Sequence, residues 1–147
     1  METPPARGVR VIRYLLDTNI ISEIHKPRPH GAVVAWFAGL RDEQICLSAV
    51  TLGELQEGIE RTRRQDPAKA NAIEAWVDEL ENSSMVVPMD ARCFREMARM
   101  MVGKQEDLLY DVMIAATARL HRLTVATRNE RDFRHLGIDV INPFKSN

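Results

Sequence analysis

Short apolar runs alternate along the chain with longer stretches in which apolar residues recur every three or four positions. The short runs are rich in β-branched and aliphatic residues, which is typical of buried strands. The longer stretches predict helices that bury one face. Strands are predicted over residues 9–17, 45–48, 85–88, 123–127 and 139–141. Helices are predicted over 20–24, 32–40, 49–64, 68–81 and 107–123, with a further one beginning at Asp90 and carrying Phe94, Met97, Met100 and Met101.

Polar and proline residues mark where several of these elements begin and end. Thr18 and Asn19 offer an N-cap for the first helix, and Pro27 and Pro29 stop it. Pro67 suits the first turn of the helix over 68–81. Two consecutive helices between strands indicate an αα-hairpin. The whole alternation predicts an α/β sandwich around a mostly parallel sheet of about five strands, with no helix between the last two strands.

Length and composition favour one globular domain. The chain has 147 residues, of which 45% are hydrophobic and 28% charged. Residues 1–8 are expected to form a loose leader, and residues 9–147 a single domain. No apolar run approaches the roughly 20 residues of a membrane span, and the start lacks a signal-peptide core. We therefore expect a cytoplasmic protein, in which Cys46 and Cys93 are buried, reduced thiols.

Net charge limits how this chain can bind nucleic acid. It has 20 Lys and Arg against 21 Asp and Glu, a formal net charge of −1. Binding driven by overall charge alone normally needs a strongly basic protein. Positive potential would therefore have to come from local patches or from bound cations.

Four acidic residues follow or precede the predicted strands and have apolar neighbours. Asp17 ends the first strand, Glu54 lies in the helix after the second, Asp111 lies early in the helix before the fourth, and Asp132 follows the fourth. Ligands of open parallel sheets bind outside the carboxyl ends of the strands. These acids are therefore candidates for one shared site.

Each acid also has a structural interpretation when taken alone. Asp17 can cap the helix that follows it, Asp111 can favour a helix N-terminus, and Asp132 can cap a turn. Glu54 can pair with Arg61 or Lys69. Several converging carboxylates, however, repel one another unless protons or a cation neutralise them. Oxygen ligands without His or Cys favour Mg²⁺ or Mn²⁺, which polarise phosphate esters and activate water.

This arrangement resembles the PIN domain, and more narrowly the VapC/FitB group of toxin–antitoxin ribonucleases. The resemblance covers about Val11 to Phe144. Its segments are LLDTNIISE (15–23), SAVTLGELQEGI (48–59), DVMIAATARLH (111–121), LTVATRNERDF (123–133) and INPF (141–144). It implies a PIN-like α/β/α sandwich and a ribonuclease that depends on Mg²⁺ or Mn²⁺.

The resemblance also assigns residues. It implies that Asp17, Glu54 and Asp111 are the three principal acids, and that Asp132 matches the fourth. Asn129 departs from relatives that carry an acid at that position, and Asp132 is expected to supply it instead. Polar positions that orient ligands or water in the family match Thr18, Asn19 and Thr127.

The same resemblance implies partners. It implies a toxin that a cognate antitoxin holds inactive, a homodimer, RNA as substrate, and contact with DNA only through the antitoxin. An antitoxin tail would lie in the acid-lined groove and place an arginine among the acids, which is electrostatically favourable. The alternative is a catalytically silent partner of a DNA-binding antitoxin in a repressor complex.

Other chemistries lack a matching pattern. The four histidines show no zinc-type spacing, and the sequence contains neither G-x-S-x-G nor a P-loop. Asp17-Thr18-Asn19 does not supply the Asp-x-Asp of haloacid-dehalogenase phosphatases. Receiver domains need a phospho-accepting Asp after a later strand, where the segment 85–88 has none.

Arginines and methionines leave two questions open. The basic cluster over 61–64 is expected to complement the helix dipole at a helix end and to face solvent, rather than to bind RNA. Three arginines around the proposed site can contact substrate phosphates or pair with neighbouring acids; these are Arg128, Arg131 and Arg134. The methionine stripe is expected to belong to the core, with a subunit interface as the alternative.

Overall fold

A five-stranded sheet forms the centre of the computed structural model, which describes residues 11–145. The strands are β1 (Tyr14–Leu16), β2 (Ile45–Ser48), β3 (Met85–Val87), β4 (Thr124–Ala126) and β5 (Val140–Ile141), in the order β3-β2-β1-β4-β5. All four pairings are parallel. The predicted leader over residues 1–8 lies outside the described residues.

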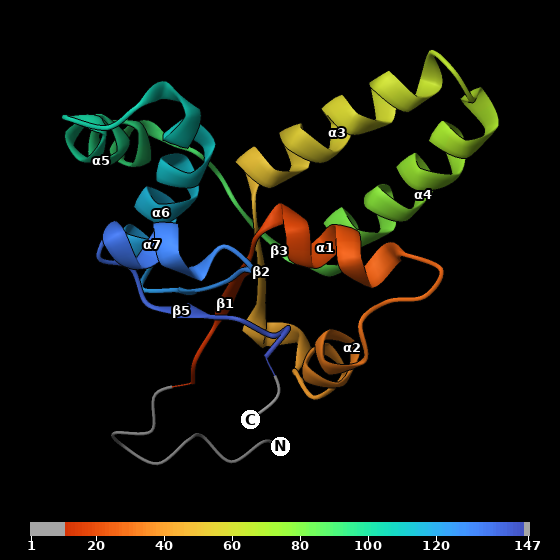
Figure 1. The fold of residues 1–147 in the computed structure, drawn as a ribbon, viewed down its shortest axis with the longest axis horizontal. Helices are drawn as coiled ribbons and strands as arrows, with labels where there is room; N and C mark the ends of the chain where they lie inside the picture. The colour runs from red at the N-terminus through yellow and green to blue at the C-terminus, as the bar shows by residue number, and fades with distance from the viewer. Residues whose placement is uncertain (1–10, 146–147) are drawn as a thin grey trace.

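Helices cover both faces of this sheet (Figure 1). The N-terminal set is α1 (Thr18–His25), α2 (Gly31–Ala38), α3 (Ala49–Arg63) and α4 (Pro67–Ser83). The C-terminal set is α5 (Ala91–Met101), α6 (Leu109–His121) and α7 (Glu130–His135). Helices α3 and α4 form the expected αα-hairpin, which projects away from the sheet in Figure 1. The predicted α/β/α sandwich is confirmed, and its sheet is parallel at all four pairings.

Alternation along the strands divides the core between the two faces. Leu15 is fully buried against α6 and α7, together with Cys46 and Val125. Leu16 points the other way and packs with Ile20, Leu47 and Ala126 under the N-terminal helices. Because both faces of the sheet are covered, the strands read as nearly continuous apolar runs in the sequence.

Capping residues set where most helices begin. Asp17, rather than Thr18 and Asn19, caps α1, so that helix begins two residues earlier than predicted. Ser48 caps α3, as expected, by accepting a hydrogen bond from the N–H of Val50. Asp66 caps α4 with Pro67 in its first turn, and Asp90 caps α5.

Two predicted boundaries need correction, and one helix was missed. The first strand is regular only from Tyr14, within the described part of the predicted run. A short 3-10 turn over Glu106–Leu108 delays the start of α6 to Leu109. Helix α7, between β4 and β5, was not predicted. It has six residues and buries only Phe133, so it is too short to show a helical period.

The cysteines and the methionine stripe are in or against the core. Both cysteines are buried and outside any disulfide within residues 11–145, as predicted. The methionines over 97–101 pack against the core, which favours the core interpretation, whereas Phe94 on the same helix is 46% exposed. Among the described helices, none is long and apolar enough to cross a membrane.

Candidate active site

Asp17 lies at the carboxyl end of β1 and is 5% exposed. Its Oδ1 accepts a hydrogen bond from the N–H of Thr18 at 2.8 Å, which caps α1. Its Oδ2 accepts from the Thr127 hydroxyl at 2.8 Å and from the Asn19 amide at 3.2 Å. Asp17 therefore does act as a helix cap, but three donors also fix its carboxylate at the centre of a polar network.

Parallel pairing of β1 and β4 brings Thr127 beside Asp17. Leu16 is in register with Ala126, and the N–H of Asp17 donates to the carbonyl of Ala126 at 2.9 Å. The next residue on each strand is therefore at the same edge of the sheet. Thr127 is fully buried, and its hydroxyl also accepts from the N–H of Asn129 at 2.9 Å. This hydroxyl joins the ends of the two central strands.

Glu54 reaches the same edge from α3. The Thr18 hydroxyl donates to its Oε1 at 3.1 Å. The alternative pairing of Glu54 with Arg61 is not observed, because Arg61 pairs with Glu57 in the next turn. Asp17 and Glu54 are thus connected through one residue, Thr18, which donates a backbone N–H to the first and a hydroxyl to the second.

Asp111 joins the network from the first turn of α6. The side-chain amide of Asn129 donates to its Oδ2 at 3.4 Å, a long hydrogen bond. Asn129 therefore connects Asp111 to Thr127, and through Thr127 to Asp17. Asn129 therefore positions Asp111 relative to Thr127, because its side-chain amide donates to the acid and its backbone N–H donates to the threonine hydroxyl.

Asp132 is placed differently from the other three acids. It is half-buried in the first turn of α7, and within residues 11–145 no hydrogen bond joins it to the network. It acts on the network through its charge, which helps to raise the pKa of Asp111. Asp132 is therefore a more distant member of the group.

Burial raises the pKa of all three connected acids, and repulsion from neighbouring acids adds to the rise for Glu54 and Asp111. For Asp17 the cause is burial, partly offset by its hydrogen bonds. For Glu54 burial again raises the pKa most, and the charge of Asp17 adds to it. Burial, followed by the charges of Asp17, Asp132 and Glu54, raises the pKa of Asp111 to about 6. Glu54 and Asp111 thus both respond to the charge of Asp17, which is the electrostatic mark of a shared site.

The carboxylates of the site are ligands of the kind that a hard cation prefers, although they do not converge on a single point. Oxygen ligands from Asp and Glu are those that Mg²⁺ and Mn²⁺ prefer. Within residues 11–145, no three His, Cys, Asp or Glu side chains lie close enough to form a ready-made metal-binding group. Thr18 lies between Asp17 and Glu54, and Asn129 and Thr127 lie between Asp111 and Asp17. The chemistry of the site fits a divalent ion, and the repulsion among its acids would be relieved by one.

Two of the three arginines predicted near the site, Arg128 and Arg134, contact neighbouring residues. Arg134 pairs with Glu130 at 3.2 Å, so part of the predicted pairing is found. The Arg128 guanidinium lies 4.7 Å from the centre of the Phe144 ring, and the backbone N–H of Arg128 donates to the side-chain oxygen of Asn19. In the other basic cluster, Arg61 and Arg63 pair with glutamates of the αα-hairpin. These ion pairs lie within the αα-hairpin, and the expectation that this cluster does not bind RNA stays a prediction.

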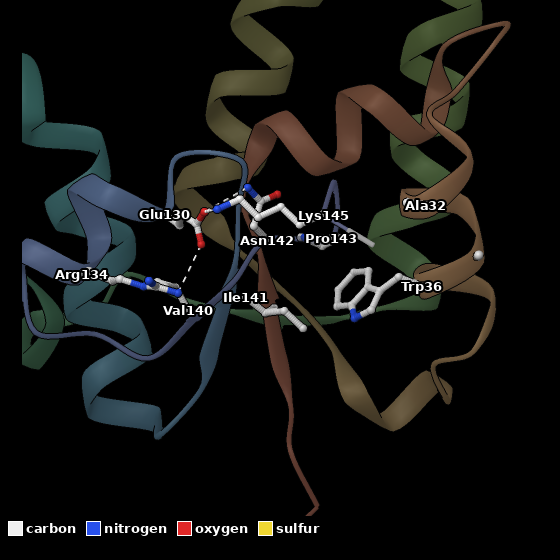
Figure 2. Close-up of a pocket in the computed structure, with 10 residues that line it drawn as sticks. Ala32, Trp36, Glu130, Arg134, Val140, Ile141, Asn142, Pro143 and Lys145 are labelled. Atoms are coloured by element: carbon white, nitrogen blue, oxygen red, sulfur yellow. Dashed lines mark hydrogen bonds and ion pairs between the residues drawn. The ribbon is translucent and has the colours of Figure 1, made fainter. Parts of the chain in front are cut away.

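A cavity of about 520 Å³ lies between α2, α7 and the segment after β5, and was not predicted from the sequence (Figure 2). Trp36 and Ala32 of α2 line one side, and Glu130 and Arg134 of α7 line the other. The segment after β5 supplies Asn142, Pro143 and Lys145. The sequence analysis singled out two parts of its lining, the run INPF and Arg134, and neither indicates that α2 lies opposite.

Two buried threonines offer a matched test of the network. Thr127 has three hydrogen-bond partners, whereas the hydroxyl of Thr51, equally buried, has none among the described residues. We expect Thr127→Val to lower the free energy of unfolding by about 1–3 kcal/mol, because it removes donors and acceptors that Asp17 and Asn129 use. Thr51→Val should be neutral or slightly stabilising. Urea unfolding of both variants gives the comparison, and equal losses would contradict the network.

Comparison with known families identifies the class of protein. Residues 14–139 match the PIN domain family. The chain therefore belongs to the PIN-domain family, within the group that contains VapC and FitB.

Similar proteins and structures cover nearly the whole chain. VapC ribonuclease Y4jK of Sinorhizobium fredii is 34% identical over 89% of this chain and 97% of its own length. Toxin FitB of Neisseria gonorrhoeae is 35% identical, over 88% and 97%. The crystal structure of FitAcB from Neisseria gonorrhoeae superimposes with a TM-score of 0.81 at 33% identity, covering 90% of this chain and 99% of the other.

Proposed function

We propose that this protein is a divalent-metal-dependent endoribonuclease and the toxin of a type II toxin–antitoxin pair. The observation that carries the proposal is the network that connects Asp17, Glu54 and Asp111 from three separate elements at the carboxyl edge of the sheet. Membership of the PIN-domain family supports it. So do relatives described as a VapC ribonuclease and as a tRNA(fMet)-specific endonuclease VapC of Shigella flexneri, the latter 32% identical over 86% of this chain.

In this proposal Asp17, Glu54 and Asp111 hold Mg²⁺ or Mn²⁺ with help from Asp132. The ion would supply the positive charge that the site lacks and lower the pKa of a bound water molecule. Thr127 and Asn19 fix the Asp17 carboxylate, and Thr18 does the same for Glu54. Asn129 orients Asp111 rather than acting as a ligand. The preformed hydrogen bonds reduce the reorganisation that cleavage of a phosphodiester requires.

Cleavage of structured RNA with and without metal tests the proposed reaction. Purified protein without antitoxin is incubated with RNA in Mg²⁺, in Mn²⁺ and in EDTA. We expect cleavage in either metal and none in EDTA. Equal cleavage in EDTA would overturn the metal dependence, and absence of cleavage in every condition would favour the silent-partner alternative.

We further propose that a cognate antitoxin binds this chain and provides its only route to DNA. Support comes from the structural neighbours, which include FitAcB and a FitAB complex bound to a DNA fragment, at 33% and 31% identity. An apolar cavity of about 230 Å³ between α1, α2 and α4, lined in part by Phe37, Trp76 and Leu80, suits a partner's apolar side chains. The acidic site would attract a cationic side chain of the antitoxin.

The alternative function is a silent partner in a repressor complex. It is favoured by the FitAB complex bound to a DNA fragment, a structural neighbour at 31% identity. A gel-shift assay with the antitoxin and its promoter DNA, run beside the cleavage assay, separates the two. Tighter DNA binding by the complex without any RNA cleavage would support the alternative.

We propose that the protein is located in the cytoplasm, where its RNA substrate is found. We also propose that it forms a homodimer through the α5–α6 side of the molecule. Phe94, Val102, Leu109 and Tyr110 on this side are 46%, 81%, 37% and 50% exposed. We expect Phe94→Lys to weaken self-association at least about tenfold, because it puts a charge in an apolar contact. Light scattering after size exclusion measures the mass. Met85→Lys, at a residue 50% exposed on β3, is the control, and a Phe94→Lys dimer as stable as the wild type would contradict this interface.

A further inference from the structure

The cavity between α2 and α7 has the size and lining of a small-ligand site. Its volume of about 520 Å³ falls within the range of about 300–1,000 Å³ typical of ligand pockets. Figure 2 shows Trp36 reaching from α2 toward Ile141, with Glu130 and Arg134 on the opposite side. Tyr14 meets the Trp36 ring edge to face, with centroids 5.1 Å apart, which limits how the indole can turn.

Local charge in this cavity is positive, in contrast to the chain as a whole. Arg134 and Lys145 both pair with the single carboxylate of Glu130. Two cations against one anion leave an excess of positive charge, while the full chain carries −1. The Arg134 and Lys145 side chains are also 63% and 69% exposed, so both can reach a phosphate without losing buried contacts.

Contacts join this cavity to the acidic site without a break. Asn142 donates to Glu130 in the cavity at 3.4 Å and accepts from the N–H of Phe144 at 3.0 Å. The Phe144 ring lies under Arg128, and Arg128 donates its N–H to Asn19. Asn19 in turn donates to Asp17. Four residues, Asn142, Phe144, Arg128 and Asn19, therefore connect the cavity lining to Asp17.

We propose that this cavity receives one unpaired nucleobase of the RNA, next to the phosphate held at the acidic site; the inference rests on the proposed ribonuclease function. The base stacks on Trp36, because every base presents a π-face to an aromatic ring. Asn142 offers its amide to the edge of the base. Arg134 and Lys145 contact the adjoining phosphate. Because a base must leave its stack to enter, the site selects single-stranded or looped RNA.

Tryptophan fluorescence gives a direct readout of this contact. The chain has two tryptophans, so Trp76→Phe leaves Trp36 as the sole indole. The probes are 2′-O-methyl hexamers of A, C, G or U, titrated in EDTA to prevent cleavage. We expect saturable quenching of Trp36 by at least one hexamer. The same titration with Trp36→Phe, in which Trp76 reports, should show no comparable quenching. Absence of quenching in the Trp76→Phe protein would overturn the proposal.

Substitutions in the cavity test the assignment by affinity. Binding of labelled hexamers, followed by anisotropy, should weaken about tenfold in Trp36→Leu, as expected for loss of one stacked base. Trp36→Phe should retain most of the affinity. Arg134→Gln and Lys145→Gln should each weaken binding and reduce the salt dependence by about 0.7 in slope. Unchanged affinity in all of these variants would contradict the site.

Arg61→Gln is the matched control for Arg134→Gln, since both arginines are exposed and pair with a glutamate four residues earlier. Arg61→Gln should leave hexamer binding unchanged. If it weakens binding as much as Arg134→Gln does, the effect comes from the overall charge of the protein, and the proposal is overturned. Equal affinity for AMP and for the A hexamer would assign the cavity to a free nucleotide instead. Loss of antitoxin binding by Trp36→Leu, with hexamer affinity unchanged, would assign it to the protein partner.

Failure of this inference is distinguishable from failure of the proposed function. If RNA is cleaved in a metal-dependent manner while the cavity variants bind and cleave as the wild type does, only the base site is wrong. If hexamers bind at Trp36 and no RNA is cleaved, the base site stands as a binding site and the nuclease proposal fails.

Discussion

Asp17→Asn and Asp111→Asn should each lower metal-dependent RNA cleavage by at least about 100-fold. Asparagine keeps the size of the side chain but removes the negative charge that would hold the ion. At Asp17 the substitution can also place an NH₂ group opposite Thr127 and Asn19, which both donate to the same carboxylate oxygen. Two donors would then lose their acceptor. At Asp111 it retains an acceptor for Asn129, so the loss there would arise from charge alone.

The control for both is Asp78→Asn, at an exposed aspartate of α4 outside the network. Initial rates of cleavage at saturating Mg²⁺, with circular dichroism to confirm folding, provide the comparison. Asp78→Asn should cleave at the wild-type rate. If Asp17→Asn and Asp111→Asn retain that rate as well, the acids are not the catalytic group.

Asp111→Asn should also make the metal-free protein more stable, by about 1–2 kcal/mol above pH 7. This is less than the full effect of a pKa raised to about 6, because the half-buried carboxylate is partly screened by solvent. For a chain of this size the gain corresponds to about 3–6 °C in Tm. Its cause is that burial and the charges of Asp17, Asp132 and Glu54 oppose ionisation of Asp111 in the folded protein.

The sign of the pH dependence follows from the raised pKa. Between about pH 4 and pH 6 the folded protein keeps the Asp111 proton that the unfolded chain has lost, so stability falls as pH rises through this window. Below the window both states are protonated and the variant gains nothing. Thermal melts from pH 4 to pH 8 in EDTA, with Asp78→Asn as reference, measure this difference. A variant less stable than the wild type at pH 7.5 would contradict the mutual repulsion of the acids.

Much of the fold was predictable because the strands are buried on both faces. Runs such as Ile45–Ser48 are apolar without alternation, and their spacing leaves room only for crossover helices. The parallel pairing then follows, and with it the meeting of Asp17 and Thr127 at one sheet edge. Helix α7 escaped prediction because six residues with one buried side chain carry no periodic signal.

The remaining parts of the site depend on tertiary contacts that the sequence does not encode locally. Nothing near Asn129 indicates that its amide reaches Asp111 on α6, or that Thr18 donates to Glu54 on α3. The cavity shows the same limit, because Trp36 and Lys145 are more than a hundred residues apart in the chain. The roles of Asp17, Glu54, Asp111 and Asp132 in binding a metal stay predictions.

Binding of Mn²⁺, followed by the loss of its free electron paramagnetic resonance signal, tests the shared acid site most directly. The wild type and Asp78→Asn should bind Mn²⁺ with the same affinity, and Mg²⁺ should compete. Asp17→Asn, Glu54→Gln and Asp111→Asn should each bind at least about tenfold more weakly, because each removes one charged ligand. Mn²⁺ affinity that is unchanged in all three variants would show that these carboxylates do not serve a common ion.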